Sequence, residues 1–249
     1  MNARFHAPGA SAPGDVVELP DDEAQHLTRV LRLETGDAVR VFNGRGEEFE
    51  AVVDAASKSR ASVRVGKPLQ AAQEATVAIT LAQAVLKGDK MDDVVRDAVM
   101  MGVAAIQPIV TTRAEVTRAA LERGNRRERW ERIALSSVKQ CGRAVVPAIL
   151  PVCDFDELAG RFSAMRLPNP ALMLVEPGAS PDVIPLGDMD STAPKEATVI
   201  VGPEGGWAAE ELQRGADSCR LITFGGRTLR ADAMAIVALA ALYTKWQEF

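Results

Sequence analysis

The clearest indication of the fold is one stretch of sequence, Val199-Ile200-Val201-Gly202-Pro203-Glu204-Gly205-Gly206-Trp207. Its apolar start is typical of a buried strand, its glycine-rich middle is typical of a turn, and residues 208–215 continue with the pattern of a helix. Glycines in such a turn let backbone N–H groups approach a ligand closely. A tight turn without a ligand would explain the same glycines, so this stretch alone leaves both interpretations open.

A second turn of the same kind follows one strand later, at Phe224-Gly225-Gly226-Arg227-Thr228-Leu229-Arg230-Ala231-Asp232-Ala233-Met234. Two such turns would meet at the carboxyl edge of a parallel sheet, which is where these sheets bind ligands. The first turn lacks the Lys-Ser or Lys-Thr of a Walker A loop, and Glu204 disfavours a phosphate. Asp232 would also serve simply as the cap of the last helix, so the pairing of the two turns is the argument for a ligand site.

From residue 76 onward, predicted strands alternate with predicted helices. The strands are expected at 76–82, 104–110, 148–152, 171–175, 198–201 and 221–224, and the helices at 89–101, 125–141, 155–162, 208–215 and from the second turn to about residue 246. Such alternation indicates a mostly parallel sheet that is covered by helices on both faces.

The first 70 residues have a different pattern. Short strands are expected at 16–19, 38–42, 48–53 and 61–65, with a hairpin turn at Asn43-Gly44-Arg45-Gly46. A helix is expected from Asp21 or Asp22 to Leu33, with Ala24, Leu27, Val30 and Leu31 on its apolar face. Short strands joined by tight turns suggest a small barrel. Because the pattern relaxes at residues 66–75, we expect a barrel domain at 1–70 and an α/β domain at 71–249.

The chain has 249 residues and a net charge of −5, which argues against a globally basic nucleic-acid binder. The charge is unevenly distributed, however, since residues 76–150 carry a net charge of +4 and residues 151–219 one of −8. An RNA-sized anion would therefore prefer the middle segment.

The small numbers of cysteines and histidines limit the kinds of site that this chain can form. Three distant cysteines and two histidines argue against a zinc site or a disulfide framework, and Cys141 has no evident basic partner that would make it a nucleophile. The N-terminus lacks the apolar segment of a signal peptide, and no window approaches the roughly 18 apolar residues of a membrane span. We therefore expect a cytoplasmic protein with no metal and no membrane segment.

Two basic segments are candidates for anion binding. Lys87 and Lys90 flank the expected start of a helix, where an anion would be stabilised; ordinary capping by Asp89, with Asp92 three residues later as in a capping box, is the alternative. The stretch 113–132 contains seven arginines against four glutamates. It would form either an ion-paired, solvated surface or a phosphate contact.

These motifs, in this order, resemble those of the bacterial methyltransferases of the SPOUT superfamily that make N3-methyluridine in 16S ribosomal RNA. The matching stretches span nearly the whole chain and are Arg4-Phe5, His26-Leu27-Thr28-Arg29-Val30-Leu31-Arg32, Lys87-Gly88-Asp89-Lys90-Met91-Asp92, Gly102-Val103, Gln140-Cys141-Gly142-Arg143, Gly202–Gly206 and Gly225–Ala233. The resemblance implies a PUA-like RNA-binding barrel at 1–70 and, at 71–249, a methyltransferase domain with a C-terminal trefoil knot. It further implies a homodimer that uses S-adenosylmethionine on 16S ribosomal RNA or the small ribosomal subunit.

The resemblance also implies the roles of individual residues. The cofactor would be held by Leu174, Val175, Glu176, Gly202, Pro203, Glu204, Gly205, Gly206, Phe224, Gly225, Leu229 and Arg230. RNA would be contacted by Arg4, His26, Arg29, Arg32, Lys87, Lys90 and Arg143. Since uridine N3 must lose its proton as it is methylated, we expect Arg230 to stabilise charge on the uracil oxygens and Asp232 or Glu204 to accept the proton.

One departure from the family pattern leaves other functions open. The usual Thr-Glu-Thr-Ala after the Leu-Arg pair is replaced by Ala231-Asp232-Ala233-Met234, which shortens the acid and removes both hydroxyls. A non-catalytic RNA-binding protein of ribosome assembly would tolerate this change. A SPOUT enzyme that methylates ribose 2′-oxygens would share the cofactor turns, whereas a nucleotide-dependent α/β enzyme is disfavoured by the missing phosphate-loop lysine.

Overall fold

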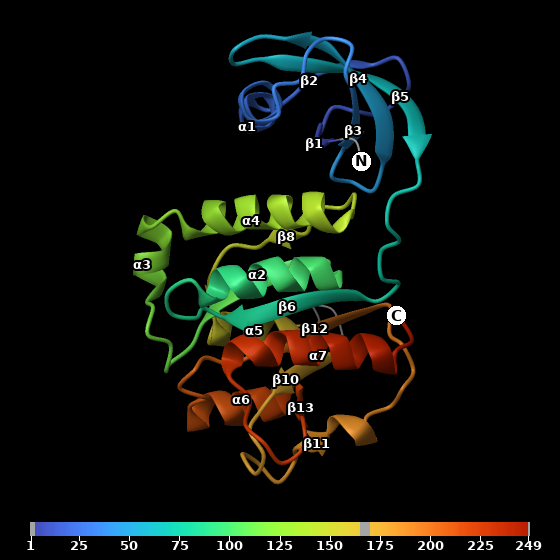
Figure 1. Ribbon diagram of the computed structural model, residues 1–249. Helices are drawn as coiled ribbons and strands as arrows, with labels where there is room; N and C mark the ends of the chain where they lie inside the picture. The colour runs from blue at the N-terminus through green and yellow to red at the C-terminus, as the bar shows by residue number, and fades with distance from the viewer. Residues whose placement is uncertain (1–2, 165–169, 249) are drawn as a thin grey trace. The chain divides into compact units, whose positions relative to one another are not determined.

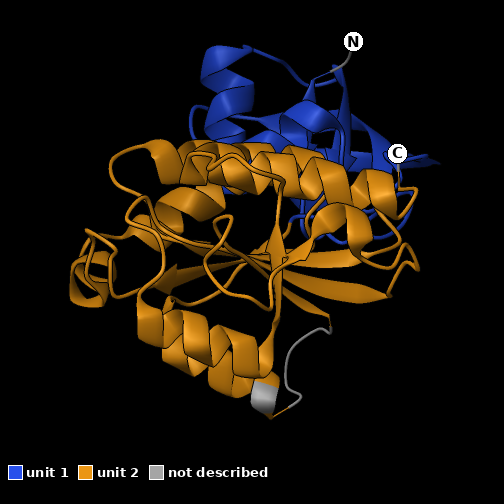
Figure 2. Cartoon of the chain, turned by 90° about the horizontal axis from the view of Figure 1, so that it is seen from below, with its two compact units in different colours: residues 1–74, 135–146 blue, residues 75–134, 147–249 orange. Residues whose placement is uncertain are grey.

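The computed structural model describes residues 3–164 and 170–248. The chain forms two compact units, which are Met1–Glu74 with Leu135–Val146, and Ala75–Ala134 with Pro147–Phe249 (Figure 2). The alternating pattern predicts residues 135–146 as part of the α/β domain. This segment belongs to the first unit because Arg4 donates to its backbone carbonyls and Glu23 pairs with Lys139.

The first unit contains a five-stranded sheet in the order β1-β3-β4-β5-β2 (Figure 1). Its strands are β1 (Arg4–His6), β2 (Val16–Glu18), β3 (Ala38–Phe42), β4 (Glu48–Ala56) and β5 (Ala61–Leu69). The expected hairpin of β3 and β4 is confirmed, and register shifts in the β4–β5 pairing let the sheet curl. The sheet encloses a core that includes Phe5, Leu27, Val41 and Val63.

The single helix expected in this unit differs from its prediction. It consists of α1 (Asp21–Gln25), which starts after Pro20 without a side-chain cap, and a π-helical turn (His26–Val30). Ala24 and Leu27 are buried, but Val30 is 67% and Leu31 is 41% exposed. A π-helical turn takes more residues than an α-helical turn, so the later residues are rotated away from the buried face that α-helical spacing predicted.

The second unit is built on a parallel sheet in the order β11-β13-β10-β12-β6-β7-β8, with β9 also paired to β7. Its strands are β6 (Ala78–Ala84), β7 (Ala105–Val110), β8 (Ala148–Ile149), β9 (Cys153–Asp154), β10 (Ala171–Leu174), β11 (Ile184–Pro185), β12 (Glu196–Val201) and β13 (Arg220–Thr223). The central strands β10 and β12 are almost entirely buried, as a sheet covered on both faces requires.

Helices cover both faces of this sheet, as the alternating pattern predicted (Figures 1 and 2). Its helices are α2 (Lys90–Met101), α3 (Arg118–Arg123), α4 (Arg126–Cys141, whose last turns belong to the first unit), α5 (Phe155–Ser163), α6 (Ala209–Ser218) and α7 (Ala231–Lys245), with a short 3-10 turn at Leu186–Asp188. α2 packs against α7, and α5 packs against α6 on the other face. Within the described part of the chain, no helix is both long enough and apolar enough to cross a membrane.

Several boundaries differ from those expected. The strand predicted at 148–152 ends at Ile149, and β9, β11 and α3 were not predicted. The capping box at the start of α2 does not form, because Asp92 accepts a hydrogen bond from Trp130 Nε1 and pairs with Arg129. Asp89 occupies the N-cap position, but its carboxylate also pairs with Arg129. Asp89 and Asp92 therefore bind side chains of another helix, although their spacing predicted hydrogen bonds to the backbone of α2.

Strand order brings the two glycine-rich turns together. In the sheet β10 lies between β12 and β13, and all three run parallel. The segments that follow their carboxyl ends, 175–177, 202–207 and 224–230, therefore meet at one edge of the sheet. This is the edge at which parallel sheets bind ligands.

Candidate active site

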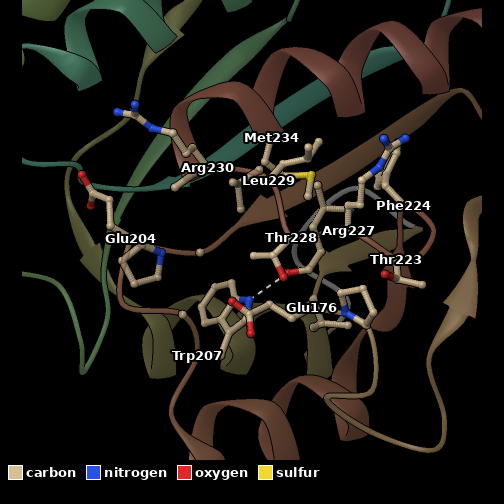
Figure 3. A pocket seen from close by; sticks show the side chains of 18 of the residues that line it. Glu176, Glu204, Trp207, Thr223, Phe224, Arg227, Thr228, Leu229, Arg230 and Met234 are labelled. Atoms are coloured by element: carbon tan, nitrogen blue, oxygen red, sulfur yellow. Dashed lines mark hydrogen bonds between the residues drawn. The ribbon is translucent and has the colours of Figure 1, made fainter.

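A pocket of about 320 Å³ opens at this edge, which is a volume suited to a small organic ligand (Figure 3). It is lined by Lys90, Leu174, Val175, Glu176, Pro177, Val201, Gly202, Pro203, Glu204, Gly206, Trp207, Thr223, Phe224, Arg227, Thr228, Leu229, Arg230, Ala231 and Met234. Most residues predicted to hold a cofactor line it; Gly205 and Gly225 do not, and neither does Asp232.

The turn after β12 is shaped by its own packing. Trp207 Nε1 donates a hydrogen bond to the carbonyl of Leu174 at 2.8 Å, which ties this turn to the end of β10 (Figure 3). A Cβ at Gly202 would lie 2.9 Å from the Trp207 ring, and Gly206 has a φ of +68°. Gly202 is thus required by its packing against Trp207, and Gly206 is required by its backbone conformation. Because neither residue has a side chain, the backbone itself forms this part of the pocket wall.

Gly205 faces Arg113, the first arginine of the stretch 113–132, for which a contact with this turn was not predicted. A Cβ at Gly205 would lie 3.1 Å from Arg113 Cβ, and Arg113 Nη1 donates to the Gly205 carbonyl at 3.2 Å. The buried carboxylate of Glu211 accepts from the backbone N–H groups of Thr112 and Ala208. The segment after β7 therefore buttresses the turn after β12, a contact between distant parts of the sequence that no local motif signals.

The turn after β13 forms the opposite wall. Besides Phe224, Leu229 and Arg230, it contributes Arg227 and Thr228, which lie within the turn from Phe224 to Arg230 that the resemblance assigned to the cofactor. Figure 3 shows the Arg227 side chain at the end of the pocket near Phe224, and the Arg230 guanidinium at the other end, near Glu204. The two arginines thus place positive charge at both ends of the pocket.

Thr223, the last residue of β13, carries an unsatisfied polar group. Its side chain lines the pocket and is buried, and its hydroxyl has no hydrogen-bond partner among the described residues. A buried hydroxyl without a partner is destabilising. A ligand with hydrogen-bonding groups would therefore fit this wall better than a wholly apolar one.

The candidate proton acceptors have different surroundings. Glu204 pairs with Lys90 Nζ at 2.9 Å. Partial burial raises the pKa of Glu204, but the hydrogen bonds from Lys90 and the backbone outweigh burial and hold that pKa below its usual value. Asp232 Oδ1 lies 3.4 Å from Arg230 Nε and, within residues 3–164 and 170–248, accepts no hydrogen bond. Glu204 is therefore held as an anion at the pocket, whereas the Asp232 oxygen is buried beside Arg230 and outside the pocket lining.

The residues predicted to contact RNA fall into two groups. Arg4 is bound to Glu48 and to the carbonyls of Val138 and Arg143, and Arg143 is bound to Glu74. Both side chains are largely enclosed in the first unit, with 12% of Arg4 and 6% of Arg143 exposed. The second group reaches solvent: it comprises Lys87, which pairs with Glu115, Lys90 at the pocket, and the exposed His26, Arg29 and Arg32.

Metal chemistry has no evident site in the described residues, in which no group of three or more His, Cys, Asp or Glu side chains converges. Cys141 is half-buried and bonds weakly to the carbonyl of Val138. The lining of the pocket offers carboxylates, guanidinium groups and backbone N–H groups around an apolar floor.

Comparison with known proteins identifies the architecture. Residues 73–243 match the family model of the RNA methyltransferase domain, and residues 19–66 match that of the RNA methyltransferase PUA domain. These matches and the neighbouring structures confirm the predicted architecture of a PUA-like barrel followed by an RNA methyltransferase domain built on a parallel sheet. The trefoil knot stays a prediction.

Similar proteins are found among both sequences and solved structures. A ribosomal RNA small subunit methyltransferase E from Neisseria gonorrhoeae, crystallised with S-adenosylmethionine, is 31% identical, with a TM-score of 0.86 over 99% of this chain and 98% of that chain. The enzymes of the same name from Buchnera aphidicola and Bacillus subtilis are 27% and 25% identical, over 93% and 89% of this chain and 88% and 87% of theirs. Taken with the family models, these similarities show that the chain belongs to the RNA methyltransferase family that includes ribosomal RNA small subunit methyltransferase E.

Proposed function

We propose that this protein uses S-adenosylmethionine to methylate N3 of a uridine in 16S ribosomal RNA. The observation that carries the proposal is the pocket at the carboxyl edge of β10, β12 and β13, where three segments converge and cationic side chains lie at both ends. This pocket belongs to a chain with the family's RNA methyltransferase and PUA domains.

The lining of the pocket fits this cofactor. Leu174, Leu229 and Met234 offer apolar contacts for an adenine ring, while the Glu176 carboxylate suits hydroxyl groups or the positive end of the ligand. The buried hydroxyl of Thr223 and the bare backbone at Gly206 add hydrogen-bonding positions. When it is bound, S-adenosylmethionine supplies an electrophilic methyl group.

The chain's own residues would prepare the uridine. N3 lies on the Watson–Crick edge, so the base must be unpaired or flipped out before it enters the site. Arg230, at the outer end of the pocket, would stabilise the negative charge that gathers on the uracil oxygens as N3 loses its proton. Asp232 and Glu204 stay the two candidate proton acceptors: Glu204 lines the pocket and is paired with Lys90, whereas Asp232 does not line it and is paired with Arg230. Since a carboxylate is a weak base, positioning would supply much of the rate.

RNA would be bound by the solvent-reaching group of basic residues. His26, Arg29 and Arg32 lie on the first unit, and Lys87 and Lys90 lie beside the pocket in the second. Arg4 and Arg143 were also predicted to contact RNA. We assign them instead the task of holding residues 135–146 to the barrel, because their side chains are largely enclosed and already paired.

The homodimer and the cytoplasmic location also belong to the proposal. α7 is apolar nearly all round, and its outer side exposes Val237 beside Ala240, Ala241 and Leu186 in a shallow apolar groove. A helix that is apolar on every side is normally buried on every side, and a second copy of this chain would cover the outer one. Ribosomal RNA as the substrate places the protein in the cytoplasm.

Calorimetric titration with S-adenosylmethionine tests the proposal. We expect wild type to bind and Gly205→Val to lose binding, because a side chain at Gly205 would collide with Arg113 and displace the turn. Nucleoside analysis of 16S ribosomal RNA treated with the enzyme should then show N3-methyluridine. Failure of the wild type to bind would contradict the proposal, and a ribose 2′-O-methyl product would replace it with the other SPOUT reaction.

A further inference from the structure

Arg113 follows β7 and lies outside the lining of the pocket, yet its side chain reaches the turn after β12. Arg113 Nη1 donates to the carbonyl of Gly205 at 3.2 Å, and the Arg113 carbonyl would lie 3.2 Å from a Cβ at Gly205. The N–H group of the neighbouring Thr112 donates to the buried Glu211 carboxylate at 2.8 Å. Arg113 is therefore held against the outer side of this turn, although the residue is exposed to solvent.

The guanidinium of Arg113 also lies close to a carboxylate that lines the pocket. From the position of a Cβ at Gly206, Glu176 Oε1 lies at 3.6 Å and Arg113 Nη1 at 4.0 Å. The two charges therefore flank the same glycine and are separated by less than the Debye length of about 8 Å at physiological salt. Within residues 3–164 and 170–248 no carboxylate lies within salt-bridge distance of Arg113, so its positive charge acts on this part of the pocket.

Glu176 is the position at which a positively charged ligand would meet an anion. The pocket is lined by two carboxylates, and the other one, Glu204, is paired with Lys90. In the described part of the chain, no cationic group lies within salt-bridge distance of Glu176. A carboxylate that is not already paired attracts a positive ligand group more strongly, so Glu176 would hold the positive end of S-adenosylmethionine.

Methyl transfer changes the charge of the ligand that Glu176 meets. The electron pair of the C–S bond stays with the sulfur as the methyl group bonds to N3, so the sulfonium of S-adenosylmethionine becomes the neutral thioether of S-adenosylhomocysteine. Glu176 by itself would bind the cationic cofactor more tightly than the neutral product. A fixed cation beside Glu176 opposes this preference, because it repels the sulfonium and does not repel the thioether.

We propose that Arg113 is a specificity-determining residue, whose charge offsets that of Glu176 and narrows the difference in affinity between S-adenosylmethionine and S-adenosylhomocysteine. The inference rests on the proposed function and adds a control of cofactor exchange to it. This electrostatic role is separable from the support that Arg113 gives to the turn. Glutamine can donate a hydrogen bond to the Gly205 carbonyl without a charge, whereas lysine keeps the charge.

The chain contains a matched control for Arg113. Arg132 on α4 is also exposed, and its Nε donates to a backbone carbonyl, that of Glu128, at 3.4 Å. Arg132 does not line the pocket. Arg132→Gln therefore reports the general effect of removing one exposed positive charge from the second unit.

The test is calorimetric titration of the full-length protein with S-adenosylmethionine and with S-adenosylhomocysteine, which gives the ratio of the Kd of the product to the Kd of the cofactor. Arg113→Gln should raise this ratio about threefold at low salt, and the increase should disappear at about 1 M salt, where the Debye length is about 3 Å. Glu176→Gln should lower the ratio by about threefold or more. Arg113→Lys and Arg132→Gln should both keep the wild-type ratio.

Three outcomes would overturn the inference: equal weakening of both ligands by Arg113→Gln, an equal rise of the ratio in Arg132→Gln, or a rise that persists at high salt. The first of these would restrict Arg113 to supporting the turn. The same titrations separate this inference from the proposed function. If wild type binds both ligands and only the ratio fails to respond, the failure belongs to Arg113 alone; if wild type binds neither ligand, the proposed function fails.

Discussion

Arg230 immediately precedes α7, and its guanidinium lies at the outer end of the pocket, 72% exposed and 3.4 Å from Asp232. Because we propose that Arg230 faces the uracil, we expect Arg230→Ala to lower kcat by roughly 100-fold or more, the usual effect of removing a group that stabilises transition-state charge. Affinity for S-adenosylmethionine should stay within about twofold of wild type, since we propose that backbone groups of the turns supply much of the cofactor contact. Single-turnover methylation and calorimetry measure the two quantities, and a collapse of cofactor affinity would show that Arg230 holds the cofactor instead.

The pairing of Glu204 with Lys90 predicts how the stability of the protein depends on pH. Partial burial raises its pKa, but Lys90 and the backbone more than offset this and lower the pKa in the folded protein. A depressed carboxyl pKa contributes stability that is present above the ordinary glutamate value and is lost as pH falls through the lowered one. The difference in melting temperature between wild type and Glu204→Gln should therefore be constant near neutral pH and shrink below about pH 4. Thermal unfolding across this range measures it, and a difference that already changes near neutral pH would contradict the assignment.

The turn after β12 makes a prediction at the scale of an element. Gly202→Ala would place a methyl group 2.9 Å from the Trp207 ring, so the ring must shift and its hydrogen bond to Leu174 must weaken. We expect a loss of about 1–3 kcal/mol in the free energy of unfolding, as for other overpacking substitutions, together with weaker cofactor binding. Denaturant unfolding and calorimetry would measure both effects.

Gly226→Ala provides the control for this substitution, because Gly226 lies in the turn after β13 and a Cβ there would meet no atom within 4 Å. Its stability and affinity should remain near those of wild type. Equal behaviour of the two variants would mean that Trp207 does not set the shape of the cofactor pocket.

At the scale of the whole molecule, the outer face of α7 predicts assembly. We expect wild type to sediment at twice the chain mass of 26.6 kDa, and Val237→Glu to sediment as a monomer, because a buried, unpaired carboxylate at the interface would be strongly unfavourable. Val52→Glu, at a valine of similar exposure on β4, should remain dimeric. Analytical ultracentrifugation distinguishes these states. A wild-type monomer that binds the cofactor and methylates RNA would refute the dimer and leave the enzyme assignment intact.

Sequence alone determined the features that depend on local chemistry. The run from Val199 to Trp207 and the motif from Phe224 to Met234 predicted the two turns that line the pocket. The hydrophobic periodicity and the turn residues also predicted two different units, a barrel of short strands and a parallel sheet with alternating helices. These predictions succeeded because apolar periodicity and glycine placement act over a few residues, where few competing interactions exist.

Only the tertiary structure decided which distant groups meet. The position of β10 between β12 and β13 brings the two turns to one edge, and residues such as Arg113 reach the turn after β12 from another strand. Asp92 binds Trp130 instead of capping the helix backbone as expected. Arg4 and Arg143 bind Glu48 and Glu74 within the first unit. The physical reason is that a charged or polar side chain bonds whichever partner the fold places within about 3 Å, and sequence spacing specifies that partner only within a helical turn or a hairpin.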